Sequence, residues 1–281
     1  MKVVLANNLG FCKGVERALK IAEEVLLENK GRKIYFYGEI VHNALVTDNF
    51  RNSGALMIKS PEEIEEPGIV IIRAHGIQDE ERKKLTDRGN WIVDCTCPVV
   101  LKGQRLVRES ERPVIVLGYK GHSEVISLSG SSNSSVIVVS SPQDLDDIAP
   151  GKYRGVVQTT FSIPVLNEII ETGSKKGIEI ELVNTICRAS IVRRTCVENL
   201  AGNVDAVVVV GDRHSANANE LVAAAKRRGC PSFLVESEDS IPNEVFAYDI
   251  IGLTAGASTP CLLYTSPSPR DSEASRMPSS A

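Results

Sequence analysis

The sequence predicts an α/β protein built from three similar α/β units, with mostly parallel sheets arranged about a pseudo-threefold axis around a common centre. Short β-branched runs alternate with helical patterns along most of the chain. Many of these runs are apolar on both faces, which is typical of buried parallel strands covered by helices. In addition, Cys12, Cys97 and Cys187 lie 85 and 90 residues apart, each just after an expected strand. This regular spacing indicates one unit that is used three times.

The expected strands are apolar runs bounded by turn residues. They are KVVLAN (2–7), KIYFYGEIV (33–41), GIVIIRA (68–74), NWIVDC (90–95), PVIVLGY (113–119), SVIVVSS (135–141), RGVVQTT (154–160), IEIELV (178–183), DAVVVVGD (205–212), PSFLVE (231–236) and YDIIGLTA (248–255). A helix is expected at 15–29, where Val15, Leu19 and Leu26 belong to one apolar helical face. Similar patterns predict the remaining helices, at 79–88, 99–111, 164–176 and 217–228.

The cysteine spacing divides the chain into three units and a tail. We expect one unit at 15–97, a second at 98–185, and a third formed by 1–14 together with 186–260. Ligands of open α/β sheets bind at the carboxyl ends of the strands, so the three cysteine loops would converge on one centre. Residues 261–281 show no strand or helix pattern and resemble the translation of a sequencing adapter. We interpret them as a non-native tail and expect no chemistry from Cys261.

Composition and charge exclude several classes of function. The 281 residues include 42% hydrophobic and 24% charged residues, with a net charge of −4. This is the composition of a soluble globular protein, without the broad basic field that binds nucleic acid. No apolar run approaches the roughly 20 residues that span a bilayer. Since MKVVLANN enters a strand at once and leaves no room for a signal peptide, we expect a cytoplasmic protein without nucleic-acid or membrane partners.

The seven cysteines carry the strongest chemical signal. An odd number without an export signal argues against a disulfide framework and favours metal binding or catalysis for a clustered subset. Cys12 lies between two glycines at a strand–helix junction, Cys97 lies in the turn CTCP, and Cys187 ends NTIC. A structural zinc site is one interpretation, but zinc ligands usually come as two close pairs. Three single thiolates on separate loops suit an iron–sulfur cluster better.

Three of the four histidines also follow expected strands, namely His42, His75 and His122. A lone loop histidine is usually a surface residue, whereas three at equivalent strand ends indicate a pocket shared with the cysteines. Glu124 lies two residues after His122. An exposed glutamate is the default interpretation. A carboxyl group inside such a pocket would instead have a raised pKa and could deliver protons.

Two further segments have the composition of anion-binding turns. GDRHSANANE runs from a strand through Ser215 and Asn217 into a helix, where hydroxyl, amide and helix N–H groups suit phosphate oxygens. GLTAGAST places Gly256 and Ser258 in a similar turn. Because serine and asparagine are also ordinary helix N-caps, each segment predicts an anion site only if it faces the cysteines.

Nine motifs in order resemble those of the 4-hydroxy-3-methylbut-2-enyl diphosphate reductase family and cover about residues 1–260. They are ANNLGFCKGV, EIVHN, RAHG, DCTCP, GHSEV, QTT, NTIC, SAN and TAGAS. Each motif is weak alone, but the ordered set is specific. The chain departs from the family pattern at Ser123, where the family usually has proline, and at Ala216, where it usually has serine.

The resemblance implies one 4Fe–4S cluster per chain at the centre of the fold, held by Cys12, Cys97 and Cys187. It implies that Glu124 and Thr159 manage protons and orient the substrate hydroxyl. The residues implied to hold the substrate's diphosphate are His42, His75, His122, Ser215, Asn217 and Ser258. The implied reaction is a two-electron reductive dehydroxylation that yields isopentenyl and dimethylallyl diphosphate, the last step of the methylerythritol phosphate route to isoprenoids. Reduced ferredoxin or flavodoxin would donate the electrons.

Two other functions remain as alternatives on the residues alone. An iron–sulfur electron carrier would need a fourth cysteine ligand, for which Cys95 and Cys196 are the candidates, and it would need no anion pocket. A zinc-stapled α/β binding module would combine the Cys-x-Cys pair with distant ligands. Metal analysis separates these functions, because only the zinc-stapled module would contain zinc without iron and sulfide.

Overall fold

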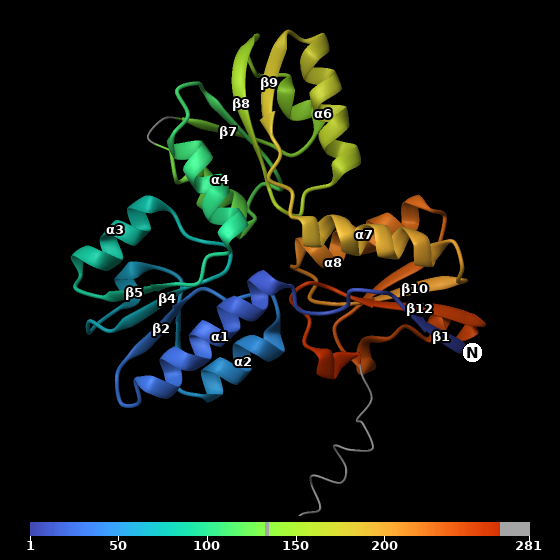
Figure 1. The fold of residues 1–281 in the computed structure, drawn as a ribbon, viewed down its shortest axis with the longest axis horizontal. Coiled ribbons are helices and arrows are strands. Elements are labelled where there is room, and N and C mark those ends of the chain that lie inside the picture. Colours follow the sequence, from blue (N-terminus) through green and yellow to red (C-terminus); the bar gives the residue numbers. More distant parts are fainter. Residues whose placement is uncertain (133–134, 265–281) are drawn as a thin grey trace, which may run out of the picture.

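The computed structural model describes residues 1–132 and 135–264 and confirms the predicted α/β class. Three lobes surround a common centre (Figure 1), and each lobe contains one four-stranded sheet. All strand pairs are parallel. Every segment predicted to be a strand contains one, and the predicted arrangement of three similar units is confirmed.

Helices cover both faces of the first sheet. In spatial order, its strands are β3 Leu56–Ile58, β2 Ile34–Tyr37, β4 Ile69–Ile72 and β5 Trp91–Asp94. The helices α1 (Lys13–Glu28) and α2 (Ala44–Asn52) pack on the face that carries Phe36 and Ile71. On the other face, α3 (Asp79–Asp87) packs through its buried leucine. The apolar runs β2 and β4 are therefore buried along their whole length.

The second sheet is built in the same way. In spatial order, its strands are β7 Val136–Val139, β6 Val114–Leu117, β8 Gly151–Val157 and β9 Ile178–Val183. Two helices, α4 (Pro98–Arg108) and α5 (Ser123–Ser129), pack on one face. The helix α6 (Ile163–Lys175) packs on the other.

The third sheet combines both ends of the described chain. In spatial order, its strands are β11 Ser232–Val235, β10 Ala206–Val210, β12 Ile250–Ala255 and β1 Lys2–Leu5. The helices α7 (Arg188–Ala201) and α8 (Ala216–Arg227) cover one face. Short 3₁₀ turns, rather than an α-helix, contact the opposite face. The edge strand β1 consequently leaves Val3 and Leu5 half exposed, at 50% and 55%.

The chain crosses from one sheet to the next at the three predicted cysteines. After β5 of the first sheet, α4 packs on the second; after β9 of the second, α7 packs on the third. The same step occurs after β1 of the third sheet, because α1 packs on the first. Cys97, Cys187 and Cys12 occupy the residue before each of these helices. The repeat inferred from the cysteine spacing is therefore a repeat of these crossings.

A second repeat accompanies the first and was not recognised in the sequence. In each unit a 3₁₀ turn precedes a central strand and begins at a serine: Ser60, Ser141 and Ser237. The backbone N–H of each serine donates to the side chain three residues later, at 3.0 Å in all three turns. The residues three positions after the serines are Glu63, Asp144 and Ser240. Because their side chains differ, the sequence does not show that the three turns have the same geometry.

The predicted helices are present with ends shifted by at most three residues, but α2, α5 and α7 were missed. The helix α5 has only seven residues, which is too few for a periodic pattern. The inward side of α7 includes the buried Arg193, so its apolar stripe is interrupted. The predicted tail begins in a 3₁₀ turn at Cys261–Leu263, and its remainder, 265–281, lies outside the described residues.

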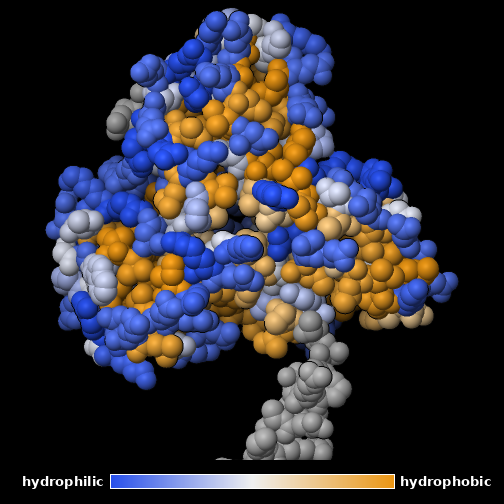
Figure 2. Space-filling model, in the orientation of Figure 1, coloured by the Kyte–Doolittle hydropathy of each residue, from blue (hydrophilic) through white to orange (hydrophobic). Residues whose placement is uncertain are grey.

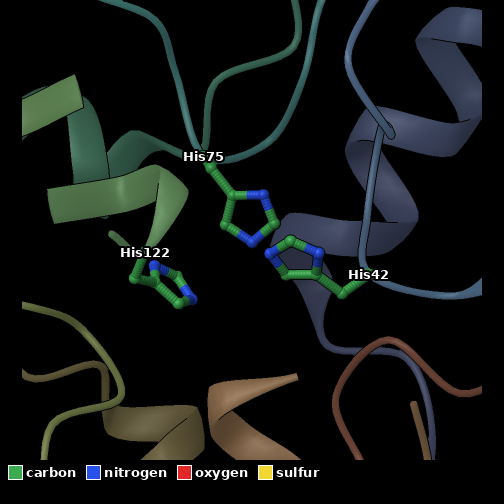
Figure 3. Close-up of side chains that lie close together, drawn as sticks. All are labelled: His42, His75 and His122. Carbon is green, nitrogen blue, oxygen red and sulfur yellow. The ribbon is translucent and has the colours of Figure 1, made fainter. Parts of the chain in front are cut away.

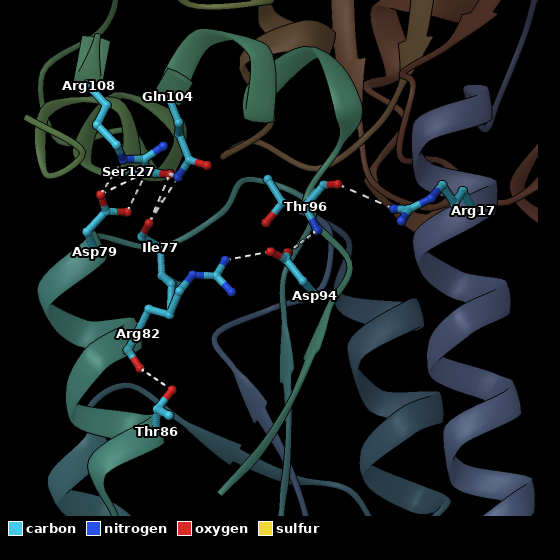
Figure 4. A network of polar contacts seen from close by, with 10 residues as sticks. All are labelled: Arg17, Ile77, Asp79, Arg82, Thr86, Asp94, Thr96, Gln104, Arg108 and Ser127. Carbon is cyan, nitrogen blue, oxygen red and sulfur yellow. Dashed lines mark hydrogen bonds and ion pairs between the residues drawn. The ribbon is translucent and has the colours of Figure 1, made fainter. Parts of the chain in front are cut away.

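Polar contacts join the first and second lobes (Figure 4). Gln104 Nε2, on α4 of the second lobe, donates to the Ile77 carbonyl of the first lobe at 3.1 Å. It also donates to Ser127 Oγ within the second lobe at 2.7 Å. Arg108 forms a bidentate pair with Asp79 at 2.8–2.9 Å. No sheet hydrogen bonds connect the described lobes, so side chains and loops set their relative position. None of the helices in 1–132 or 135–264 has the length and apolar character needed to cross a bilayer.

Candidate active site

The three predicted cluster cysteines are N-caps of the helices that begin at the lobe crossings. Each cysteine N–H donates to a carbonyl at the end of another strand in the sheet that it leaves. These bonds run from Cys12 to Ala257 at 3.1 Å, from Cys97 to Ala74 at 2.9 Å, and from Cys187 to Thr159 at 2.9 Å. The thiols thus occupy equivalent positions at helix N-termini.

The sulfur atoms face a common space, kept open by Gly14. A Cβ atom on Gly14 would lie 2.9 Å from Cys97 Sγ and 3.8 Å from Cys12 Sγ. Burial raises the pKa of the Cys97 thiol, hydrogen bonds from the backbone N–H groups of Val99 and Val100 lower it, and the charges of Cys12 and Cys187 raise it. Among the described residues, these three sulfur atoms do not form a set within 4.8 Å of one another. Two sulfurs on one zinc ion would lie at most about 4.6 Å apart, so this donor set suits a multi-iron cluster better.

Two cavities meet at the cysteines. The inner cavity has a volume of about 110 Å³. Its walls include all three cysteines and most of the other residues singled out in the sequence, namely His75, Glu124, Thr159, Ser215, Asn217 and Ser258. The surface is hollowed where the lobes meet (Figure 2). The outer cavity, of about 840 Å³, shares the three cysteines and is lined by basic residues such as Lys13, Arg17 and Arg188.

Glu124 is the buried acid of the inner cavity. Only 2% of this residue is exposed. Thr159 holds its carboxyl group with two hydrogen bonds of 2.7 Å, one from the backbone N–H and one from the hydroxyl. Burial raises the carboxyl pKa from 4.5 to about 7, although both threonine bonds act in the opposite direction. The default interpretation of an exposed loop glutamate is therefore wrong for Glu124.

The three strand-end histidines converge on one point beside this cavity (Figure 3). The ring centroids of His42 and His75 are 4.4 Å apart, and His122 lies 5.6 and 5.5 Å from them. A ring nitrogen from each lies within 4.8 Å of the other two. Nε2 of His42 and Nδ1 of His75 are buried without a hydrogen-bond partner. These two nitrogens indicate a ligand, since buried polar atoms are normally paired.

Burial favours the neutral form of the three imidazoles. It lowers the pKa of His42, lowers that of His75 well below the ordinary range, and lowers that of His122 to about 4. The mutual repulsion of the rings and the charge of Arg73 act in the same direction. An anion placed among the rings would reverse these effects, because it stabilises the protonated form.

The anion-binding candidates of the third lobe also reach the inner cavity. Ser215 is the N-cap of α8 and accepts a hydrogen bond from the Ala218 N–H at 3.3 Å. Asn217 accepts a bond from the Ala257 N–H at 2.8 Å. Ser258 donates to the His42 carbonyl at 2.9 Å and so ties the third lobe to the first. Both segments therefore face the cysteines, as the anion-site prediction required.

Residues that the sequence analysis did not single out support the site from nearby. Glu39 approaches His42 Nδ1 at 3.4 Å, and Asn43 caps α2 by accepting the Val46 N–H at 3.2 Å. Arg193 donates to the Gly10 carbonyl at 2.7 Å and anchors the loop that carries Cys12. Glu39 and Asn43 are the first and last residues of the quoted motif EIVHN, so that motif was the available signal for two of these three residues.

Comparison with known proteins decides the family. The sequence model described as LytB protein matches residues 3–266. The chain belongs to the LytB family. A curated LytB relative from Actinobacillus pleuropneumoniae serotype 7, named 4-hydroxy-3-methylbut-2-enyl diphosphate reductase, is 35% identical over 95% of this chain and 88% of its own length. A relative of the same name from Histophilus somni is 36% identical over the same shares.

Two solved reductase structures share the LytB fold. The E-1-hydroxy-2-methyl-but-2-enyl-4-diphosphate reductase from Plasmodium falciparum superposes with a TM-score of 0.87 at 30% identity, covering 93% of this chain and 85% of its own. A second structure is described as (E)-4-hydroxy-3-methyl-but-2-enyl diphosphate reductase, the terminal enzyme of the non-mevalonate pathway. It gives a TM-score of 0.67 at 32% identity and covers 94% of this chain and 96% of its own.

The two extra cysteines weighed as cluster ligands lie away from the inner cavity of this LytB protein. Cys95 is fully buried in the apolar core of the first lobe, and burial raises its pKa to about 12. Cys196 lies on α7, where its sulfur accepts a hydrogen bond from Asn8 at 3.6 Å. Neither cysteine lines the inner or the outer cavity. The structure therefore offers no fourth thiolate at the centre among the residues that it describes.

Proposed function

We propose that this chain reduces 4-hydroxy-3-methylbut-2-enyl diphosphate to isopentenyl and dimethylallyl diphosphate. In this reaction the allylic C–O bond breaks, two electrons and two protons enter, and the hydroxyl oxygen leaves as water. The observation that carries the proposal is the inner cavity, which is lined by three thiols, a buried acid and several anion-binding groups. The names of the relatives support the same substrate.

Cys12, Cys97 and Cys187 would hold one 4Fe–4S cluster per chain. Their helix N-terminal positions, the space above Gly14 and the separation of their sulfurs all fit this group. Three protein thiolates on a four-iron cluster leave one iron without a protein ligand. When bound, the cluster would supply electrons and a Lewis-acidic iron to the reaction.

The diphosphate would lie between the histidines and the third lobe. His42, His75 and His122 are positioned to donate to phosphate oxygens, and the unpartnered Nε2 of His42, which points toward His75 (Figure 3), supports this role. Ser215, Asn217 and Ser258 would complete the subsite with hydroxyl, amide and helix N–H groups.

Glu124 would hold the proton that the departing hydroxyl needs. With a pKa of about 7 it is partly protonated near neutral pH, which is the condition for a general acid. Thr159 already donates its hydroxyl to this carboxyl, and we propose that it orients the substrate hydroxyl against the acid. Burial of the pair excludes bulk water, so protons would pass through Glu124.

We further propose a cytoplasmic location and reduced ferredoxin or flavodoxin as the electron donor. The basic lining of the outer cavity supports an acidic donor, since Lys13, Arg17 and Arg188 lie beside the cysteines. We assign the units to 15–97, 98–185 and 1–14 with 186–260, and we keep 261–281 as a non-native tail.

Anaerobic purification of single-cysteine variants tests the proposal. Cys12→Ser, Cys97→Ser and Cys187→Ser should each lose the brown cluster absorbance and the reduction of the hydroxylated allylic diphosphate. The matched control is Cys230→Ser, which alters a buried cysteine of the third-lobe core and should retain both properties. A normal cluster in any of the first three variants would show that the ligand assignment is wrong. Zinc without iron and sulfide in the unmodified chain would exclude the reductase.

A further inference from the structure

We propose that His42, His75 and His122 form a binding site for a divalent transition-metal ion such as Zn²⁺, and that this ion competes there with phosphate oxygens. One ring nitrogen from each histidine lies within 4.8 Å of the other two. Three histidines with an open fourth position are a ligand set of catalytic zinc sites. The site uses none of the three cysteines, so its metal chemistry does not depend on the proposed reductase activity.

The orientation of His42 is that of a metal ligand. Glu39 Oε2 lies 3.4 Å from its Nδ1, so the N–H of this neutral ring is directed to the carboxylate. Nε2 then carries the lone pair, is buried without a partner, and points toward His75 (Figure 3). Metal-binding histidines commonly donate their other ring N–H to a carboxylate in this manner, which fixes the tautomer and the ring orientation.

The remaining adjustment is small. Two nitrogens on one zinc ion lie about 3.3 Å apart at Zn–N distances of about 2.0 Å, so the rings must approach one another by roughly 1.5 Å. His122 also changes its hydrogen bond, because its Nδ1 accepts the Glu124 N–H at 3.1 Å. With a metal on Nε2 the ring proton moves to Nδ1 and this bond breaks. Three metal–nitrogen bonds outweigh the loss of this one hydrogen bond.

Charge and ligand type select the class of metal. Glu39 and Asp212 favour a cation at His42, whereas Arg73 opposes it. Neutral imidazoles suit Zn²⁺ and Co²⁺, while Mg²⁺ requires oxygen ligands. The site should therefore bind Zn²⁺ and discriminate strongly against Mg²⁺.

Competition with phosphate follows from the nitrogen atoms themselves. A ring nitrogen holds a phosphate oxygen through its proton, but it holds a metal through the lone pair that replaces this proton. One nitrogen cannot do both at once. Zn²⁺ in the site and a diphosphate on the same three histidines are therefore mutually exclusive.

Zinc binding to the cluster-loaded protein, under anaerobic conditions, tests the first part of the proposal. Equilibrium dialysis should give one tight Zn²⁺ per chain, and Mg²⁺ in large excess should not displace it. Zinc-edge X-ray absorption, which is blind to the iron, should show nitrogen neighbours at about 2.0 Å and no sulfur at about 2.3 Å. A sulfur shell would place the ion on cysteines and overturn the proposal.

Single substitutions locate the ion. His42→Asn and His122→Asn should each weaken Zn²⁺ binding at least tenfold, as measured on protein whose far-ultraviolet circular dichroism is unchanged. The matched control is His214→Asn, because His214 is exposed and is not one of the three grouped histidines. Unchanged Zn²⁺ affinity in both His42→Asn and His122→Asn would overturn the site. The direct spectroscopic measurement on the unmodified protein stands even if a variant does not fold.

Inorganic pyrophosphate tests the competition. Because pyrophosphate also chelates zinc, a metal buffer must hold the free Zn²⁺ concentration constant during the titration. Bound zinc per chain should then fall as pyrophosphate rises, with half-displacement at higher pyrophosphate when free Zn²⁺ is higher. Constant or increasing zinc occupancy would overturn the competition and indicate a ternary complex.

Discussion

At the scale of single residues, Glu124 is a buried carboxyl whose only described side-chain partner is Thr159. We expect Glu124→Gln to keep the fold and the cluster but to lower turnover of the hydroxylated allylic diphosphate by at least about 100-fold, because the amide cannot supply the proton. Steady-state kinetics on cluster-loaded protein measures this effect. Glu171→Gln, at an exposed position on α6, is the matched control and should leave turnover unchanged. Turnover of Glu124→Gln within twofold of the unmodified protein would remove the proton role.

The raised pKa of Glu124 also predicts how stability depends on pH. Its folded value of about 7 lies above the unfolded value of 4.5, so the protonated acid favours the folded state. This contribution is complete below the unfolded pKa and is lost as the pH rises through the folded pKa. Glutamine does not ionise. The free energy of unfolding of Glu124→Gln should therefore gain about 2 kcal/mol relative to the unmodified protein between about pH 5 and about pH 8.

Urea unfolding of both proteins at the two pH values, under anaerobic conditions, measures this difference. The histidines titrate in both proteins, so their contribution cancels in the comparison. A difference that is independent of pH would mean that Glu124 keeps an ordinary pKa. A gain at low pH instead of high pH would mean that the carboxylate, rather than the acid, is the form stabilised by Thr159.

The sequence predicted the residues that gather at the site, but it did not predict the hydrogen bonds between them. Strand-end positions placed His42, His75 and His122 in one region, and the structure brings their rings together. The bond from Thr159 to Glu124 joins residues 35 apart in the sequence and has no periodic signal. Likewise, Glu39 precedes His42 by three residues in what reads as a strand, and only the turn after β2 lets them meet.

At the scale of elements, the helix N-termini build the site. The N-caps of α1, α4 and α7 are the three cysteines. The N-caps of α5 and α8 are His122 and Ser215. Sequence patterns found the long amphipathic helices because a single apolar face packs on each sheet. They missed α2, α5 and α7, which are short or carry polar groups toward the centre, whereas α1, α4 and α8 were predicted although they also begin at the site.

The first turn of α1 provides a test in which helix stability and site geometry change in opposite directions. Gly14→Ala should favour the isolated helix by up to about 1 kcal/mol. However, the added Cβ would lie 2.9 Å from Cys97 Sγ, closer than side chains normally approach. We therefore expect less iron and sulfide per chain after anaerobic purification, with unchanged far-ultraviolet circular dichroism. Lys20→Ala, at an exposed position of the same helix, should retain full iron. Full iron in Gly14→Ala would show that the glycine is dispensable.

At the scale of the whole molecule, three sheets with one strand order meet only through loops and side chains. The cysteine spacing predicted this repeat because one cysteine stands at each crossing between sheets. The unit bounds drawn at the cysteines already assign α1 and α4 to the unit that follows each crossing, and α1, α4 and α7 each pack on the sheet after the crossing. The spacing does not contain the order of the strands within each sheet, because that order depends on contacts between residues far apart in the sequence.

This arrangement predicts that a shared group at the centre stabilises the meeting of the lobes rather than the lobes themselves. The central strands β2, β6 and β10 are buried within their own lobes, whereas the loops with Cys12, Cys97 and Cys187 depend on one another. In Cys97→Ser, hydrogen exchange measured by mass spectrometry should accelerate in the three cysteine loops and remain slow in the three strands. Cys230→Ser, in the third-lobe core, should not accelerate exchange in the loops of the other lobes. Equal acceleration in loops and strands of Cys97→Ser would mean that the molecule unfolds as one unit, and that the centre is part of the fold's common core.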